Sequence, residues 1–299
     1  MSTQSLPVVA GVEHDWVDVD GVKLHLAQAG IEHRSPDRPT LVLIHGWPQH
    51  WFCWRHVMVE LAQTHHVIAV DLRGAGWSDA PRGTAAYDKR VMADEIARLC
   101  EVLELSRPVL VGHDWGAWVS LLVASRHPEL PAGVVAAAIV APWVKAGWSD
   151  LWRFSYQLIA GGPGGSWLHA HGGQLLLKTV LRLGSSRGFS FDPADRQEYL
   201  DRFVEPARAK AGRSMYRQFL CVEIGQTLRR KYAEKVREVP LLFLPGRHDG
   251  VLTPRLVSSA AGPANVTVNV IENSGHWVPE EQPAALAGQV RGFVAGLAR

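Results

Sequence analysis

Short apolar runs alternate with longer segments of helical periodicity along most of the chain. Continuous apolar runs this short are typical of strands buried on both faces of a parallel sheet. The runs that predict strands are Val22–Ala27, Thr40–Ile44, His66–Val70, Pro108–Val111, Val134–Val140, Val239–Leu244 and Val266–Ile271. Apolar residues at helical spacing predict helices over Arg90–Leu105, Ala117–Arg126 and Pro283–Leu297. The alternation predicts an α/β fold with a mostly parallel central sheet flanked by helices on both faces.

The pattern changes after Pro142. Residues 143–235 hold a Gly-Gly-Pro-Gly-Gly run at 161–165 and many arginines, but no clean short β-run. We interpret this region as a helical insertion. The predicted organisation is therefore a core domain of residues 1–141 and 236–299, interrupted by a helical domain of residues 142–235.

The composition adds to this picture chiefly by exclusion. Hydrophobic residues make up 47% of the 299 residues, which is ordinary for a globular chain that buries a full core. Lysine and arginine number 31 against 29 acidic residues. The resulting formal net charge of +2 gives no reason to expect nucleic acid or an anionic membrane as a partner.

The cysteines and the N-terminal residues indicate in which cellular compartment the protein is expected. Cys53, Cys100 and Cys221 lack CxxC spacing and fit reduced thiols in a cytosolic protein better than disulfides or a zinc site. The first residues contain neither a basic segment nor a long apolar run, and no stretch of about 18 apolar residues occurs in the sequence. We therefore expect a cytoplasmic protein without a signal peptide, a membrane span or a metal site.

The strongest local signal for chemistry is the segment Gly112–Gly116 (GHDWG), between a predicted strand and a predicted helix. That context is required of a nucleophile elbow, in which small flanking residues let the chain turn sharply and raise one side chain above the sheet. Here the raised side chain is the carboxylate of Asp114 rather than a serine hydroxyl. The alternative interpretation is a glycine-bracketed turn in which Asp114 only caps the following helix.

Two further residues follow predicted strands in the order expected of a hydrolase triad. Asp249 comes just after the strand Val239–Leu244, and His276 comes just after the strand Val266–Ile271. The chain order is nucleophile, acid and histidine, as in α/β-hydrolases. Because functional groups gather at the carboxyl ends of parallel strands, we predict that Asp114, Asp249 and His276 meet at one edge of the sheet.

The segment after the strand Thr40–Ile44 stands where this arrangement supplies an oxyanion hole. One backbone N–H comes from this segment and a second from the residue after the nucleophile. By position these donors belong to Trp47 and Trp115, whose side chains would also wall the pocket. The pocket residues predicted from this segment are His45, Gly46, Trp47 and Pro48. A tight turn with ordinary aromatic packing is the alternative.

These residues together resemble the core motifs of the α/β-hydrolase fold, in its epoxide hydrolase branch. The resembling segments are His45–Pro48, Asp71–Asp79, Gly112–Ala117 and Gly275–Trp277, within residues 15–141 and 238–299. The resemblance implies an α/β-hydrolase fold with a helical cap inserted after the sixth strand. It also implies an aspartate nucleophile and no cofactor.

Members of this branch carry two cap tyrosines that hydrogen-bond the epoxide oxygen. The segment around Tyr156 resembles the one that bears the first tyrosine, and the segment around Tyr216 resembles the one that bears the second. Tyr199 is a rival for the second role. Ordinary packing in the cap is the alternative for each tyrosine.

The activity that the resemblance implies is the hydrolysis of a small apolar epoxide to a vicinal diol. Asp114 would form a covalent ester, which water activated by His276 and Asp249 would hydrolyse. Tyr156 and Tyr216 would act as the acids. Three alternatives stay open: a haloalkane dehalogenase with the same nucleophile, an inactive hydrolase fold that only binds a partner, and haloacetate dehalogenation, which is weaker because no arginine follows Asp114 in Trp115–Ala117. The sequence does not fix the natural substrate or the oligomeric state.

Overall fold

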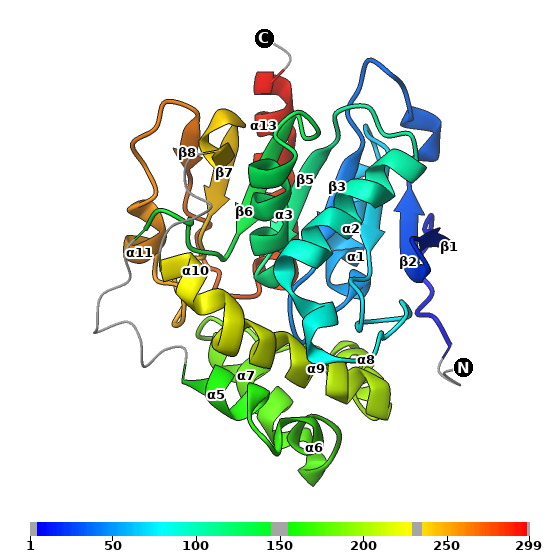
Figure 1. Ribbon diagram of the computed structural model, residues 1–299. Coiled ribbons are helices and arrows are strands. Elements are labelled where there is room, and N and C mark those ends of the chain that lie inside the picture. The colour runs from blue at the N-terminus through cyan, green and yellow to red at the C-terminus, as the bar shows by residue number, and fades with distance from the viewer. Residues whose placement is uncertain (1–4, 145–154, 229–234, 298–299) are drawn as a thin grey trace.

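A mixed sheet forms the centre of the computed structural model, which describes residues 5–144, 155–228 and 235–297. Within these residues, eight strands lie in the order β1-β2-β4-β3-β5-β6-β7-β8. The strands are β1 Glu13–Val19, β2 Val22–Ala29, β3 Leu41–Ile44, β4 Val67–Val70, β5 Val109–His113, β6 Gly133–Ala137, β7 Leu241–Leu244 and β8 Val266–Val268. The β1–β2 and β2–β4 pairs are antiparallel, and all other pairs are parallel (Figure 1). The predicted α/β class and mostly parallel sheet are confirmed.

The strand β1, which opens the first hairpin, is one element that the apolar pattern does not predict. Most side chains of β1 are exposed or half-buried, so this strand has no continuous apolar run. Asp20 and Gly21 close the hairpin with φ angles of 52° and 84°. Two successive positive φ angles are what a two-residue turn between antiparallel strands requires, and Asp-Gly is a favoured pair there. The Asp-Gly pair is therefore the sequence signal for this hairpin.

Two strands end earlier than predicted. β6 stops at Ala137, because the next residue, Ala138, has a φ of 48° and leaves the sheet. β8 ends at Val268, and beyond it a single bridge joins Gly246 to Ile271. Ala138 and Ile271 are nevertheless buried. Apolar residues thus continue past the last paired residue, which is why the apolar runs overstate both strands.

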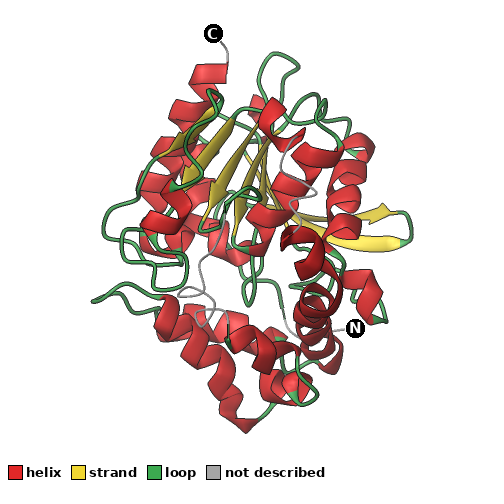
Figure 2. Ribbon diagram, turned by 60° about the vertical axis from the view of Figure 1, so that its left-hand side comes forward, coloured by secondary structure: helices red, strands yellow, loops and turns green. Residues whose placement is uncertain are grey.

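Helices cover both faces of the sheet (Figure 1, Figure 2). On one face α2 packs against α3, and on the other α1 packs against α13. The core helices are α1 Arg55–Leu61, α2 Lys89–Val102, α3 Trp115–Arg126, α11 Pro254–Ser258, α12 Val278–Glu281 and α13 Pro283–Leu297. The α13 bounds match the prediction, whereas α2 ends at Val102, before Leu105, and α3 begins at Trp115, inside the GHDWG segment.

The insertion lies between β6 and β7 in the chain and beyond the carboxyl ends of the parallel strands (Figure 1). Its described helices are α5 Tyr156–Gly161, α6 Gly165–Ala170, α7 Leu175–Gly184, α8 Pro193–Arg202, α9 Pro206–Gln218 and α10 Ile224–Leu228. A π-helical turn, η6 (Phe219–Glu223), joins α9 to α10. A helical insertion after β6 is thus confirmed. Its limits at 142 and 235 remain a prediction, since residues 145–154 and 229–234 lie outside the described part.

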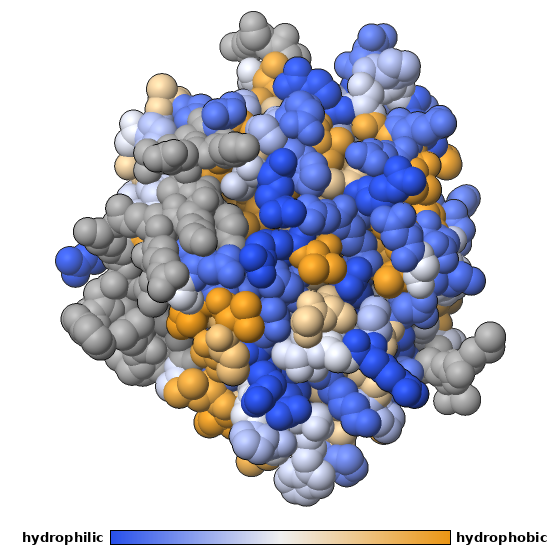
Figure 3. Space-filling model, viewed as in Figure 1, coloured by the Kyte–Doolittle hydropathy of each residue, from blue (hydrophilic) through white to orange (hydrophobic). Residues whose placement is uncertain are grey.

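The core and the insertion differ in how completely their apolar side chains are buried. Every residue of β3, β4 and β5 is buried, whereas several large apolar side chains of the insertion are exposed. These exposed residues are Leu158, Ile159, Trp167, Leu175, Leu183, Val204, Val222 and Ile224. Figure 3 shows apolar atoms gathered over this part of the molecule, at its lower left. The sheet is therefore the principal hydrophobic core, and the insertion is a thinner layer laid over its edge.

Candidate active site

Asp114 occupies the sharp turn between β5 and α3. Its φ of 50° and ψ of −122° lie in a region that residues other than glycine rarely adopt. Such a conformation costs about 1–3 kcal/mol. A Cβ at Gly112 would overlap the backbone of Ala117, and a Cβ at Gly116 would overlap the carbonyl oxygen of Ile44. Close backbone approach therefore requires both glycines, as expected of a nucleophile elbow.

The Asp114 carboxylate does not cap the helix that follows it, so the alternative of a simple capping turn is wrong. Asp114 stands at the N-cap position of α3 but makes no side-chain capping bond. Its Oδ2 instead accepts a 3.0 Å hydrogen bond from the backbone N–H of Trp47. The backbone N–H of Trp115 also stabilises the charged carboxylate. These two N–H groups are the ones that position in the sequence predicts for an oxyanion hole.

The loop after β3 reaches the carboxylate because Gly46 has no side chain. A Cβ at Gly46 would overlap both the Cβ and the carboxylate of Asp114. Glycine therefore lets the backbone pass directly over Asp114 and presents the N–H of the next residue, Trp47.

His45 and Pro48 complete this loop. The Nε2 of His45 accepts a 3.1 Å hydrogen bond from the N–H of Leu72, and its Nδ1–H donates to the carbonyl of Gly46 at 2.9 Å. Because a backbone N–H only donates, Nε2 carries no proton and His45 is neutral. Burial also lowers the pKa of His45. Pro48 follows Trp47 through a cis peptide bond.

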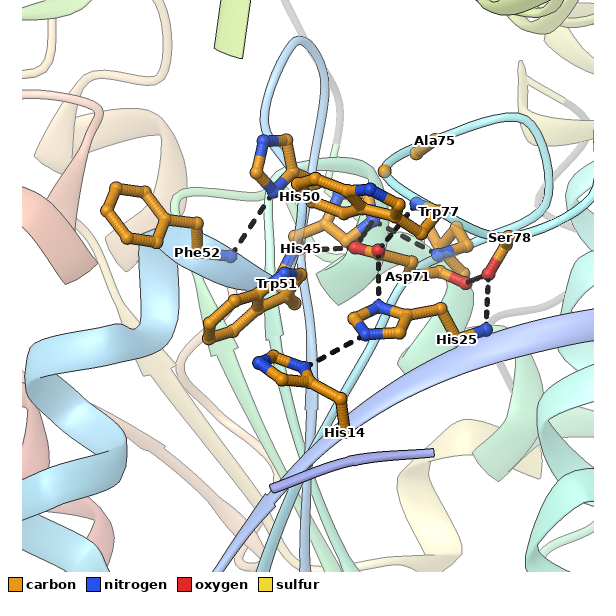
Figure 4. A network of polar contacts seen from close by, with 12 residues as sticks. His14, His25, His45, His50, Trp51, Phe52, Asp71, Ala75, Trp77 and Ser78 are labelled. Carbon is orange, nitrogen blue, oxygen red and sulfur yellow. Dashed lines mark hydrogen bonds and ion pairs between the residues drawn. The ribbon is translucent and has the colours of Figure 1, made fainter. Parts of the chain in front are cut away.

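A buried network around Asp71 ties the loop after β3 to the loop after β4 (Figure 4). The Asp71 carboxylate accepts hydrogen bonds from the backbone N–H of Trp51 at 2.7 Å and of Trp77 at 2.9 Å. It also accepts one from Nδ1 of His25 at 2.7 Å. Burial alone would raise the pKa of Asp71, but the hydrogen bond and charge of His25 hold it below its usual value. The network therefore fixes the loop that carries Trp47.

His276 lies between two carboxylates. Its Nδ1 is 2.9 Å from Oδ2 of Asp249, and its Nε2 faces Oδ1 of Asp114 at 3.9 Å. Oδ1 of Asp249 also accepts 2.8 Å hydrogen bonds from the N–H groups of Val251 and Leu252, which fix that side chain. The structure thus brings the three predicted triad residues together, each from a loop that follows a parallel strand.

Asp114 and His276 form a buried ion pair. Burial raises the pKa of Asp114 to about 6, although the charge of His276 and the N–H groups of Trp115 and Trp47 lower it. Burial opposes the charge on His276, but Asp249 and then Asp114 raise its pKa to about 9. At pH 7 Asp114 is therefore an anion and His276 a cation. Neutralising Asp114 would remove one of the charges that keep His276 protonated.

Two further residues hold the histidine loop. Nε2–H of His113 donates a 2.7 Å hydrogen bond to the carbonyl oxygen of His276, and burial lowers the pKa of His113 to about 3. Glu281 accepts hydrogen bonds from the N–H groups of Gly275 at 2.9 Å and Trp277 at 3.1 Å. Our sequence reasoning missed Glu281, because an acidic residue in a short helix after the histidine carries no distinguishing signal.

Tyr156 and Tyr216 lie together against the two tryptophans that flank Asp114. The ring centroid of Tyr216 is 5.0 Å from that of Trp47, 5.7 Å from that of Trp115 and 5.9 Å from that of Tyr156. Tyr216 is buried, and its hydroxyl has no hydrogen-bond partner among the described residues. Burial raises the pKa of both phenols, and the Asp114 charge adds to the effect. Both phenols therefore keep their protons at pH 7.

Tyr199, the rival for the second tyrosine, faces a different part of the molecule. Its hydroxyl donates a hydrogen bond to Glu280. Its ring packs against His50 and Phe52 of the core. Tyr199 thus belongs to the contact between insertion and core, and Tyr216 is the tyrosine that lies beside the elbow.

A cavity lies beside the two tryptophans but is not the reacting centre. Trp47 and Trp115 line it, whereas Asp114 and the two tyrosines of the site do not. Arg73 and Tyr87 in its wall already bind protein partners, a glutamate and a backbone carbonyl respectively. The carboxylate of Asp114 therefore lies outside the set of residues that line this cavity.

The comparison with known families identifies the fold. Residues 39–283 match the alpha/beta hydrolase fold family, and the chain belongs to that family. The soluble epoxide hydrolase of a Corynebacterium species is 28% identical over 302 residues, which cover 96% of this chain and 98% of that protein. Epoxide hydrolase A of Mycobacterium tuberculosis is also 28% identical, over 94% of this chain and 97% of that protein.

A solved structure extends this likeness to the whole molecule. Wild-type Cfl2 from Burkholderia cenocepacia is 32% identical, with a TM-score of 0.79 over 95% of this chain and 96% of that one. The chain is therefore an α/β hydrolase related to epoxide hydrolases. In the described part of the chain, none of the helices combines the length and apolar character needed to cross a membrane.

Proposed function

We propose that this protein is an epoxide hydrolase, which converts an epoxide and water to a vicinal diol. The observation that carries the proposal is a carboxylate at the elbow of a hydrolase fold, with the unpartnered hydroxyl of Tyr216 beside it. A carboxylate nucleophile displaces at a saturated carbon and forms an ester whose carbonyl belongs to the enzyme. A strained ether oxygen leaves readily only when an acid donates a proton to it.

In the first step Oδ1 of Asp114 attacks a ring carbon, because Oδ2 is held by the N–H of Trp47. The new bond joins Oδ1 to carbon, and the bond from that carbon to the epoxide oxygen breaks. Tyr216, with Tyr156, donates the proton that converts the departing oxygen to a hydroxyl. The phenol then recovers a proton from the His276 cation through solvent, which leaves a neutral imidazole as base.

In the second step Nε2 of His276 takes a proton from water, and the water oxygen attacks the carbonyl carbon of the ester. The N–H groups of Trp47 and Trp115 stabilise the negative charge that develops on Oδ2. Collapse breaks the bond between Oδ1 and the carboxyl carbon. Oδ1 leaves as a hydroxyl oxygen of the diol, with a proton from His276, and the water oxygen stays on the Asp114 carboxyl group. The carboxylic proton of Asp114 then passes to His276, which restores the resting ion pair.

The wall of the site favours an apolar substrate. The ring of Trp115 contacts those of Tyr216 and Phe219, and the ring of Trp47 contacts those of Tyr216 and Phe203. Such a wall binds alkyl or aryl groups through buried area, and the phenols provide uncharged acids. A small apolar epoxide is therefore the substrate class that we propose.

One observation favours haloalkane dehalogenation as a second candidate. The indole N–H groups of Trp47 and Trp115 are buried and have no hydrogen-bond partner among the described residues. Two such donors beside a carboxylate nucleophile would suit a departing halide. The same ester on Asp114 and the same hydrolysis would follow.

A paired assay separates the two activities. We expect the purified protein to convert styrene oxide to phenylethanediol and to release little bromide from 1-bromobutane. In a His276→Gln variant, mass spectrometry should detect a covalent adduct on the Asp114 peptide with styrene oxide. Bromide release without diol formation would favour the dehalogenase, and neither product nor adduct would contradict both proposals.

A further inference from the structure

A fully buried lysine lies at the junction of core and insertion, outside the groups used above. Lys89 begins α2, and none of its surface is exposed. Lysine is almost never fully buried unless it is paired. Its Nζ donates a 2.8 Å hydrogen bond to the carbonyl of Met215 and lies 3.2 Å from a carboxylate oxygen of Glu223. Met215 and Glu223 belong to the insertion, whereas a third and longer bond, at 3.5 Å, goes to the carbonyl of Tyr87 in the core. A core side chain thus binds the insertion at two residues.

One of those points is the residue directly before Tyr216. The hydrogen bond from Lys89 to the carbonyl of Met215 fixes the peptide unit that leads into Tyr216. The α9 helix continues only to Gln218 before the π-helical turn η6 begins. π-helical turns are rare and occur frequently at functional sites. Lys89 thus binds the last turn of α9, the helix that carries Tyr216.

The same ammonium group also faces the tryptophan after the nucleophile. Nζ of Lys89 lies 4.6 Å from the ring centroid of Trp115 and 5.6 Å from that of Phe219. A cation over an indole face is attracted by the ring quadrupole, and more strongly when it is buried. Lys89 therefore contacts the side chain whose backbone N–H serves Asp114.

Glu223 completes the junction from the cap side. Its second carboxylate oxygen accepts a 3.3 Å hydrogen bond from the backbone N–H of Lys89, at the start of α2. The side-chain amide of Gln218 donates to Asp88, the residue that caps α2, at 3.0 Å. The end of α9 and the η6 turn are thus bound to one helix N-terminus of the core.

We propose that Lys89 is a positioning residue that sets Tyr216 against the Asp114 nucleophile by holding Met215 and Trp115 at the same time. This inference rests on the proposed function and goes beyond it, since Lys89 touches neither the carboxylate nor the substrate. Ring opening needs the acid and the nucleophile on opposite sides of one epoxide. Displacement of either by about 1 Å is enough to slow such a step by up to 10²-fold.

A charge effect accompanies this geometry. The positive charge of Lys89 and the negative charge of Asp114 interact, as do those of Lys89 and Asp88. Removing the lysine charge takes away a cation that interacts with the carboxylate of Asp114 and leaves it less stabilised. The pKa of Asp114 then rises, and alkylation needs a higher pH to begin. A purely structural role for Lys89 predicts no such shift.

The test measures alkylation alone, in a His276→Gln background where the ester accumulates. Styrene oxide is the probe, and mass spectrometry of the intact protein gives the rate of adduct formation. The variants are Lys89→Met and the double variant Lys89→Met with Glu223→Gln, which removes both charges and leaves no buried ion unpaired. Asp195→Asn is the matched control, because Asp195 is a cap carboxylate that pairs with core Arg55 at 2.7 Å.

We expect both Lys89 variants to alkylate about tenfold or more slowly than the parent, and the control to match it. In the single variant the acid limb of the alkylation rate should move to higher pH. Should Lys89→Met fail to fold, the double variant and its thermal unfolding decide the outcome. Alkylation within twofold of the parent in the folded Lys89 variants, or equal slowing in the control, would overturn the inference.

The His276→Gln parent shows whether a negative result contradicts the proposed function or only the positioning role of Lys89. If the His276→Gln parent forms no adduct with styrene oxide, the proposed function fails. If the parent alkylates and the Lys89 variants alkylate equally fast, only the positioning role fails.

Discussion

The core edge and the helical insertion differ in whether the polar groups that they present to the site are hydrogen-bonded within the protein. On the core side Asp114 is bound by the N–H of Trp47, and His276 is bound to Asp249 at 2.9 Å. On the insertion side, the hydroxyl of Tyr216 is buried without a partner among the described residues. A buried polar group left unpaired costs about 1–3 kcal/mol. The core half is therefore hydrogen-bonded within the protein, and under the proposed function the substrate oxygen would be the partner of the Tyr216 hydroxyl.

Buried polar contacts join the two regions, in addition to the apolar cluster that runs through both. Arg55 of α1 binds Asp195 of α8 at 2.7 Å and Glu280 of α12 at 2.9 Å. Arg202 donates to the carbonyl of Gly76 at 2.9 Å. Hydrogen bonds fix orientation more sharply than apolar contacts do. These hydrogen bonds thus help to hold the tyrosines of the insertion in a fixed position relative to the core, although the insertion is a thin layer.

The largest expected effect comes from the core side. Asp114→Asn should reduce diol formation at least about 10⁴-fold, because an amide is a poor nucleophile and removal of a nucleophile costs on this scale. Steady-state turnover of styrene oxide measures this, with mass spectrometry to exclude deamidation back to aspartate. Turnover near the wild-type rate in a variant that is still asparagine would contradict the nucleophile assignment.

The second-largest effect is expected from the tyrosines of the insertion, and it should slow only the ring-opening step. Replacing Tyr156 and Tyr216 together by phenylalanine should slow alkylation about 10²–10⁴-fold, the usual contribution of general acid catalysis. Tyr199→Phe is the matched control, because its hydroxyl binds Glu280 instead. We expect the control to alkylate at the parent rate, measured by adduct formation in the His276→Gln background. If the parent protein forms no diol but releases bromide, and the double variant still releases bromide, the dehalogenase is favoured.

The pH dependence should separate the two chemical steps. Alkylation needs the Asp114 carboxylate, whose pKa burial raises to about 6, so its rate should fall about tenfold between pH 7 and pH 5. Hydrolysis needs neutral His276, whose pKa is about 9 in the resting ion pair and falls once the ester removes the Asp114 charge. Its rate should therefore rise with pH to a plateau that begins below pH 9. Pre-steady-state measurements of both steps check this; identical profiles would refute the ion pair.

The smallest effect should come from a contact between the regions that lies away from the site. Asp195→Asn removes a partly exposed partner of Arg55, which keeps its hydrogen bond to Glu280. We expect a loss of less than about 1 kcal/mol in the free energy of unfolding and an unchanged kcat. Urea unfolding and steady-state kinetics measure the two quantities. A large loss of kcat would mean that the whole junction, not the Lys89 contacts alone, sets the site.

The core half of the site could be predicted from the sequence because its signals are local. Gly112 and Gly116 bracket Asp114 between a strand and a helix, and each glycine is required by backbone contact. His276 and Asp249 follow strands that apolar runs reveal. In such a fold, the end of a parallel strand fixes where a side chain lies. Even the Trp47 N–H follows from position alone.

The insertion half could not be derived in the same way. Tyr216 is a helical aromatic residue like many others, and only the resemblance to a family singled it out. Lys89 and Glu223 are 134 positions apart, so no local pattern links them. Glu281 likewise acts through backbone N–H groups that a sequence does not show. Contacts between distant segments depend on how the insertion docks, which apolar periodicity does not encode.

A single turnover in water enriched in oxygen-18 tests the central claim, that the carboxylate of Asp114 forms the covalent intermediate. With enzyme in excess over styrene oxide, the first diol should contain no solvent oxygen. One oxygen-18 atom should appear in the peptide that contains Asp114. A first diol that carries the heavy oxygen, with an unlabelled protein, would mean that water attacks the epoxide directly and would contradict the account.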